Sequence, residues 1–246
     1  MLAQGGKRVL CDAESSNRAE MTETKEKSWL ARKAEQALRS GFTRAYETVR
    51  VDPQHYLTHL RTAHGLPIRT YQGVFSVPLE ELDQIAADTI RAAMKIAAAE
   101  GAGLGIGGIM TLVPDLGILA AITMRMIQKL SLVYGFEFNT DDEIAELWIA
   151  TASAAGVDIS RELVERSVVR QFVPRVIQRI ATQASGEVVE KWAGRVIPLL
   201  SSVIGGALNY YFIRAWSQRA ARHFREKHMA MRAKLVQAGE VPLLGP

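Results

Sequence analysis

Two stretches of this 246-residue chain are almost free of charge, and they constrain the fold more than any other feature. Residues 101–124 are 24 residues with Asp115 as their one charge, and residues 196–213 are 18 residues with none. Both approach the length at which a helix crosses the hydrocarbon core of a bilayer, which is about 20 residues. The stretches are therefore either membrane-inserting segments or central helices that are buried on every side.

Several residues inside the two stretches argue against a membrane span. Asp115 lies near the middle of the first stretch, where an acid costs about 3 kcal/mol on insertion scales. Pro114 and the five glycines of residues 101–108 are expected to divide this stretch into two helices, each too short to span. The second stretch contains Pro198 and Asn209. We therefore expect these helices to be buried or to insert only at a membrane surface.

Small residues allow two helices to approach closely, so the glycines of the two stretches are expected to form an intramolecular crossing. The glycines expected at this crossing are Gly103, Gly107 and Gly108 with Gly205 and Gly206.

The rest of the chain has the periodicity of amphipathic helices. Apolar residues recur at spacings of three, four and seven from residue 24, and again after Pro78, where acids occupy the first turn. Asp52 and Pro53 form a typical helix start, and residues 66–77 are expected to be a loop or short extended piece. No segment shows the alternation of apolar and polar residues that is typical of a strand. The sequence predicts an all-α single domain of about seven to nine helices with the two Gly-rich apolar helices at its centre.

Domain and helix boundaries follow from composition and from glycine and proline. We expect a disordered charged tail over residues 1–24, a helical domain over 25–234 and a C-terminal tail over 235–246. The expected helix boundaries are an end at Glu100–Gly101, a start at Pro114, a basic helix over 160–183, a short element over 186–194, and a last helix that Pro198 and Gly205–Gly206 interrupt.

An ordered series of motifs resembles the EcsC family. The motifs are Glu100–Gly108, Pro114–Leu116, Arg125, Ile127, Tyr134–Phe136, Ile197–Pro198 and Val203–Tyr210, with Phe75–Pro78 and the acidic helix that follows it. The similarity covers about residues 40–230. It implies a bacterial helical protein of a family named for a gene beside an ABC exporter, and it implies no particular biochemical activity.

Three polar residues inside the apolar sequence are candidates for a pocket: Glu100, Asp115 and Asn209. A buried carboxylate near a glycine-rich turn can bind a metal or act as a general acid or base. The structural alternatives are that Asp115 caps or begins its helix and that Glu100 pairs with an arginine such as Arg125. No motif contains an activated serine or cysteine nucleophile, so catalytic residues are unknown.

Nucleotide, cofactor and metal sites are not expected. Residues 103–108 match G-x-G-x-x-G only formally, because the motif requires a strand before the turn and a helix precedes it here. His55 and His59 are four residues apart and can share a helix face, which is a spacing that suits zinc. No glutamate lies beside His55, and the one cysteine, Cys11, is remote in sequence, so these histidines are metal candidates by spacing alone.

Charge is distributed unevenly along the chain. Residues 161–234 contain 14 basic and 5 acidic residues, whereas the remainder contains 16 and 21. Arginines follow the second apolar stretch, whose helix also carries Tyr210, Tyr211 and Trp216. This pattern favours an anionic lipid surface over nucleic acid as the partner. A purely solvated basic face is the alternative. The predicted lipid-facing residues are Arg214, Arg219, Arg222 and Arg225.

The N-terminal 28 residues contain no apolar run of secretory length, which predicts a cytoplasmic protein. We expect a non-enzymatic accessory or interaction protein that lies peripherally on the inner face of the membrane, with a protein partner such as a transport or secretion system. The alternative is a soluble metal-dependent or acid–base enzyme with a site near Asp115 and Asn209.

Overall fold

A computed structural model describes residues 28–104, 109–159, 169–193 and 201–242. These residues form eight helices and no strand, which confirms the predicted all-α domain of seven to nine helices. The first helix covers residues 28–48. The elements that follow are α2 (Pro53–Ala63), the 3₁₀ helix η1 (Tyr71–Ser76), α3 (Leu79–Leu104), α4 (Ile109–Val133), α5 (Asp141–Ala154), α7 (Val169–Ala193) and α8 (Ser201–Gln237).

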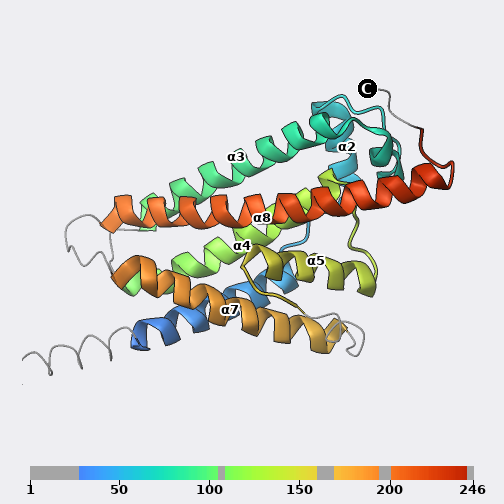
Figure 1. The fold of residues 1–246 in the computed structure, drawn as a ribbon. Coiled ribbons are helices and arrows are strands. Elements are labelled where there is room, and N and C mark those ends of the chain that lie inside the picture. The colour runs from blue at the N-terminus through green and yellow to red at the C-terminus, as the bar shows by residue number, and fades with distance from the viewer. Residues whose placement is uncertain (1–27, 105–108, 160–168, 194–200, 243–246) are drawn as a thin grey trace, which may run out of the picture.

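Helix α8 runs along the length of the molecule and organises the other helices around it (Figure 1). It lies beside α3 with the opposite chain direction, and this is the most extensive helix pair among α2, α3, α4, α5, α7 and α8. Helix α4 packs against both α3 and α8, and α5 connects α8 to α7. The helix of residues 28–48 lies next to α7, where the carboxylate of Glu35 accepts a hydrogen bond from the amide of Gln178.

Large aromatic side chains join three of these helices in the core. The ring of Phe42 stacks on Trp216 with centroids 5.9 Å apart, and it meets the edge of Trp148 at 6.3 Å. All three side chains are buried. Aromatic pairs contribute about 0.5–1.5 kcal/mol beyond the area that they bury, so this cluster fixes the helix of residues 28–48 against α5 and α8.

The predicted helix boundaries are wrong at several glycines and prolines. Helix α3 continues through Gly101 to Leu104, α7 continues through Gly186, and α8 passes without a break through residues 205–206. A glycine costs a helix only about 1 kcal/mol relative to alanine, so tertiary packing can override it. Helix α4 starts five residues before Pro114, so Pro114 is the sixth residue of the helix and not its start. A proline at this position removes one intrahelical hydrogen bond at a cost of about 3 kcal/mol, which the packing of the helix must offset.

The two ends of the predicted domain differ in what the structure shows. Residues 1–27, which include the predicted N-terminal tail, lie outside the described residues. At the other end α8 extends to Gln237, and the side chain of Val241 is buried. Glu240 accepts a hydrogen bond of 3.2 Å from the amide of Gln72. The folded part therefore extends past residue 234, where the sequence predicted a tail.

One window within the described helices, Leu116–Val133 of α4, is long and apolar enough to cross a membrane. It overlaps only the last nine residues of the uncharged stretch 101–124, and it includes Arg125 and Lys129. In the fold 67% of this window is buried among other helices. That degree of burial is typical of the central helix of a helical bundle. The sequence predicted either such a helix or a membrane-inserting segment.

Candidate functional site

The three predicted pocket residues lie in different surroundings. Glu100 is exposed near the end of α3, and Asn209 is buried in α8 with 5% of its surface accessible. Asp115 is the seventh residue of α4, so it neither caps nor begins that helix as the sequence suggested, and its side chain lies outside the described residues. No ion pair joins Glu100 to Arg125, although both side chains are described. A shared pocket for the three residues stays a prediction.

The glycines of the expected crossing lie partly outside the described residues. Gly107 and Gly108 lie outside the described residues, and for Gly103, Gly205 and Gly206 the structure describes only the helical backbone. Gly103 lies in the last turn of α3, and the other two lie in the second turn of α8; these two helices lie side by side. The crossing itself stays a prediction.

A different pair of glycines forms a close crossing that the structure does describe. A Cβ atom on Gly41 would lie 2.8 Å from the Cα atom of Gly117 in α4, which is closer than real Cβ contacts. The helix of residues 28–48 therefore approaches α4 as closely as it does because position 41 has no side chain.

The four predicted lipid-facing arginines divide into two pairs. Arg214 and Arg222 are exposed on α8. Arg219 turns toward the end of α5, where its guanidinium lies 3.0 Å from the position of a Cβ atom built on Gly156. Arg225 is engaged with Asp83 of α3 in a polar network.

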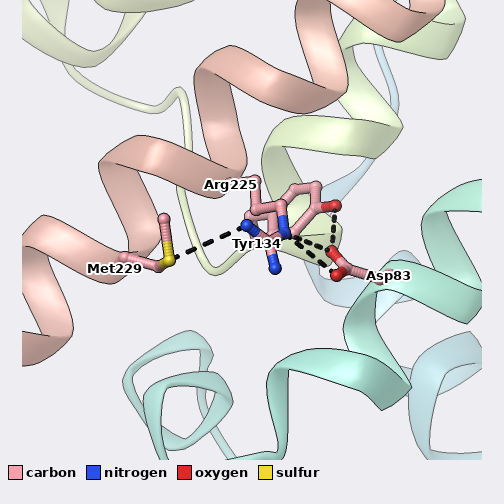
Figure 2. A network of polar contacts seen from close by, with 4 residues as sticks. All are labelled: Asp83, Tyr134, Arg225 and Met229. Carbon is pink, nitrogen blue, oxygen red and sulfur yellow. Dashed lines mark hydrogen bonds and ion pairs between the residues drawn. The ribbon is translucent and has the colours of Figure 1, made fainter.

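Figure 2 shows this network, which joins α3, α4 and α8. The Tyr134 hydroxyl donates to Oδ1 of Asp83 at 2.8 Å, and Nε of Arg225 donates to both carboxylate oxygens at 2.9 and 3.2 Å. Burial, with the Asp83 carboxylate next to it, holds the pKa of the Tyr134 phenol well above its usual range. The phenol therefore stays a neutral donor, and the network acts as a clamp between helices, without an activated nucleophile.

A buried histidine continues this clamp on α8. The ring of His228 stacks on Phe75 with centroids 4.8 Å apart, and its Nδ1 lies 2.9 Å from the carbonyl oxygen of Tyr134. A carbonyl can only accept, so Nδ1 carries the proton and Nε2, which has no hydrogen-bond partner, is bare. Burial lowers the pKa of this imidazole.

The second cluster of polar side chains lines a cavity of about 420 Å³ between α2, α3 and α4, which we call the α2–α4 cavity. Asp52 caps α2 by accepting from the backbone N–H of Gln54 at 2.9 Å, and Pro53 begins the helix, as the sequence predicted. The buried face of α2 is made by Pro53, Tyr56, Leu57 and Leu60. Tyr56 and His59 follow one turn apart, so both reach the cavity.

Aromatic and cationic side chains follow one another along the mouth of the α2–α4 cavity. The ring centroids of His64 and His59 are 5.5 Å apart, and those of His59 and Tyr56 are 5.6 Å apart. The Lys129 ammonium lies 5.9 Å from the Tyr56 ring centroid, and Arg125 is one turn before it on α4. The Tyr56 hydroxyl is 3.4 Å from the Thr89 hydroxyl.

Like charges crowd this mouth. Burial and the Arg125 guanidinium lower the pKa of Lys129. Burial first, and then His64, Lys129 and His55, lower the pKa of His59. Asp88 is the one acid among the lining residues, and it forms an ion pair with Arg91 on its own helix. The mouth therefore has a surplus of positive charge that no lining carboxylate neutralises.

The predicted metal candidates belong partly to this cavity. His59 lines it beside His64, whereas His55 is exposed and is not among the lining residues. Within the described ranges, no group of three or more His, Cys, Asp or Glu side chains has the geometry to hold a metal ion. Sequence spacing identified His59 but missed Tyr56, Arg125 and Lys129, since pairing α2 with α4 requires the tertiary fold.

A second cavity, of about 390 Å³, lies where η1, the α4–α5 connection and α8 meet. Acidic side chains line it, including Glu143 and Glu146, and Lys227 enters it from α8. The Lys227 ammonium already pairs with Glu146 at 2.8 Å and lies 4.6 Å from the ring centroid of Phe136. The ion pair between Lys227 and Glu146 stabilises the contact between α5 and α8.

Comparisons with known proteins agree with the motif series. The model of the EcsC protein family matches residues 15–229. Protein EcsC of Bacillus subtilis (strain 168) is 28% identical over 167 residues, which cover 66% of this chain and 70% of that protein. No solved structure matches the chain significantly. Because the family match covers most of the sequence, including the helices α2 to α5, α7 and most of α8, the chain belongs to the EcsC protein family.

Proposed function

We propose that this protein is a non-enzymatic accessory or interaction protein that lies peripherally on the anionic inner face of the cell membrane, beside a transport or secretion system. The observation that carries the proposal is one exposed face of α8, made by residues at spacings of three, four, four and seven. The residues of this α8 face are Tyr211, Arg214, Gln218, Arg222 and Met229, all exposed.

Charge on α8 supports a lipid partner. The helix contains seven basic residues and one acidic residue, Glu226. A basic residue near an anionic bilayer surface contributes about 1 kcal/mol, so Arg214 and Arg222 together contribute about 2 kcal/mol. Tyr210 and Tyr211 are exposed one turn before Arg214, and aromatic rings with a polar edge favour the headgroup region.

Flotation with lipid vesicles tests this proposal. Wild-type protein is expected to float with phosphatidylglycerol vesicles and not with phosphatidylcholine vesicles, and its binding is expected to fall as salt rises. The double variant Arg214→Gln/Arg222→Gln is expected to bind about tenfold to thirtyfold more weakly, which corresponds to about 2 kcal/mol.

The matched control is Arg39→Gln/Arg44→Gln, which removes the same charge from exposed positions of the helix of residues 28–48. An equal loss in this control would show that net charge, and not the α8 face, determines binding. Absence of wild-type binding at low salt would contradict the proposal itself. The alternative of an enzyme near Asp115 and Asn209 gains no support from the described side chains.

A further inference from the structure

We propose that the α2–α4 cavity is a binding site for a phosphate monoester that carries an apolar group. The phosphate lies at the cationic mouth and the apolar group on the floor of the cavity. The site is separate from the α8 face, so this inference does not depend on the proposed membrane association.

The mouth of the α2–α4 cavity carries several cationic side chains. Arg125 and Lys129 come from successive turns of α4, and His59 and His64 approach from α2. Asp88, the one acid among the described lining residues, is paired with Arg91. Burial and then the neighbouring cations lower the pKa values of Lys129 and His59, and an anion bound between these groups offsets the repulsion between the cations.

The number of donors favours a phosphate over a carboxylate. The mouth offers a guanidinium fork, an ammonium group and two imidazoles, with the hydroxyls of Tyr56 and Thr89 deeper in the cavity. A carboxylate has two oxygens and one charge, whereas the phosphate of a monoester has three terminal oxygens and carries between one and two charges at pH 7. Arginine binds such oxygens in pairs, and lysine adds a point charge.

The floor of the cavity favours an apolar substituent on that phosphate. Small side chains on α3 and α4, among them Ala92, Ala93 and Ala121, leave the space open. Ile96 and Ile122 line the same space, and Ile96 is 53% exposed, which is high for an isoleucine. The volume of about 420 Å³ is within the range of small-molecule sites, about 300–1,000 Å³.

A side-chain amide holds the mouth in shape. Gln128, which is buried on α4, accepts from the backbone N–H of Val51 at 2.8 Å and donates to the carbonyl of Val49 at 2.9 Å. These bonds attach the connection before α2 to α4, so α2 and its histidines are positioned before a ligand arrives. Preorganisation of this kind reduces the entropy that binding costs.

Isothermal titration with hexyl phosphate and with inorganic phosphate tests the site. Wild-type protein is expected to bind hexyl phosphate at least tenfold more tightly than inorganic phosphate, because two or three methylene groups buried on the floor are sufficient for that factor. The variant Arg125→Gln/Lys129→Gln is expected to bind hexyl phosphate at least tenfold more weakly, and the exposed control Arg39→Gln/Arg44→Gln to bind it as wild type does.

A second variant tests the floor without altering charge. Ala92 is exposed at the cavity wall, so Ala92→Leu fills the space without disturbing the core. It is expected to bind hexyl phosphate no more tightly than inorganic phosphate, with the affinity for inorganic phosphate within twofold of wild type. Equal wild-type affinity for the two ligands, no binding of either, or unchanged hexyl phosphate binding in the charge variant would overturn the proposal.

Vesicles distinguish the two sources of such a ligand. Phosphatidylcholine vesicles that contain a small fraction of phosphatidic acid present the monoester as a lipid headgroup, and hexyl phosphate presents it as a free molecule. Vesicle binding that is lost in Arg125→Gln/Lys129→Gln but kept in Arg214→Gln/Arg222→Gln assigns a lipid to the cavity. Unchanged vesicle binding in the cavity variant, with loss of hexyl phosphate binding, assigns a soluble ester.

Discussion

Gly41 shows how much a single position decides in this fold. Its missing side chain allows the helix of residues 28–48 to cross α4 at Gly117. The sequence predicted a crossing between glycines of the two almost uncharged stretches. Gly41 lies in an ordinary amphipathic helix, where neither composition nor spacing distinguishes it. Its role depends on which backbone lies opposite, and that is a property of the tertiary structure.

We predict that Gly41→Ala destabilises the protein by about 1–3 kcal/mol, because the new methyl group meets backbone and the two helices must separate. The measurement is urea unfolding followed by circular dichroism. Gly117→Ala is the control at the same crossing, since a Cβ atom there meets nothing within 4 Å. It is expected to be neutral or to stabilise by up to about 1 kcal/mol, from helix propensity. Equal effects of the two substitutions would contradict this account of the crossing.

At the scale of helices, the clamp of Asp83, Tyr134 and Arg225 joins three elements that are far apart in sequence. Helical periodicity predicted α3, α4 and α8 as elements, because apolar side chains must recur every three to four residues to reach a core. It did not predict their lengths. Helices α3, α7 and α8 continue past glycines at which local helix propensity predicts an end. Packing against neighbouring helices stabilises them by more than the glycines cost.

We predict that Tyr134→Phe lowers the free energy of unfolding by about 1 kcal/mol, because the Asp83 carboxylate loses a donor from a buried hydroxyl. A double-mutant cycle with Asp83→Ala is expected to give a coupling of about 0.5–1.5 kcal/mol. The control pair is Asp88 and Arg91 on the same helix, whose side chains are 53% and 66% exposed. Its cycle is expected to give about 0.5 kcal/mol or less, so a coupling of that size for Tyr134 and Asp83 would argue against the clamp.

At the scale of the whole molecule, the buried His228 and the half-buried His223 of α8 link stability to pH. Burial lowers the pKa of His228, and burial together with Lys227 lowers that of His223, so the folded protein holds both rings neutral where the unfolded chain binds protons. A group with a lowered folded pKa stabilises the fold fully above its unfolded pKa, about 6.5. That contribution is lost as the pH falls through the folded pKa.

We therefore predict that the free energy of unfolding falls between pH 7 and pH 5, with a slope of at most about 1.4 kcal/mol per pH unit for each histidine. His228→Phe keeps the stack on Phe75 and is expected to flatten the slope, at the cost of the hydrogen bond to Tyr134. The exposed His55→Gln is expected to leave the slope unchanged. Denaturant unfolding at several pH values measures this, and identical slopes in wild type and His228→Phe would exclude the proposed origin.

The sequence by itself determined the helical class, the motif order that marks the EcsC family and the start of α2 at Asp52–Pro53. These properties depend on residues that are near one another in the chain, through helical periodicity and capping. Only the tertiary structure decided which helices meet, and with them the Gly41 crossing, the Asp83 clamp and the cationic mouth of the α2–α4 cavity. Each of these joins residues tens of positions apart, and their proximity follows from how whole helices pack, which local sequence patterns do not encode.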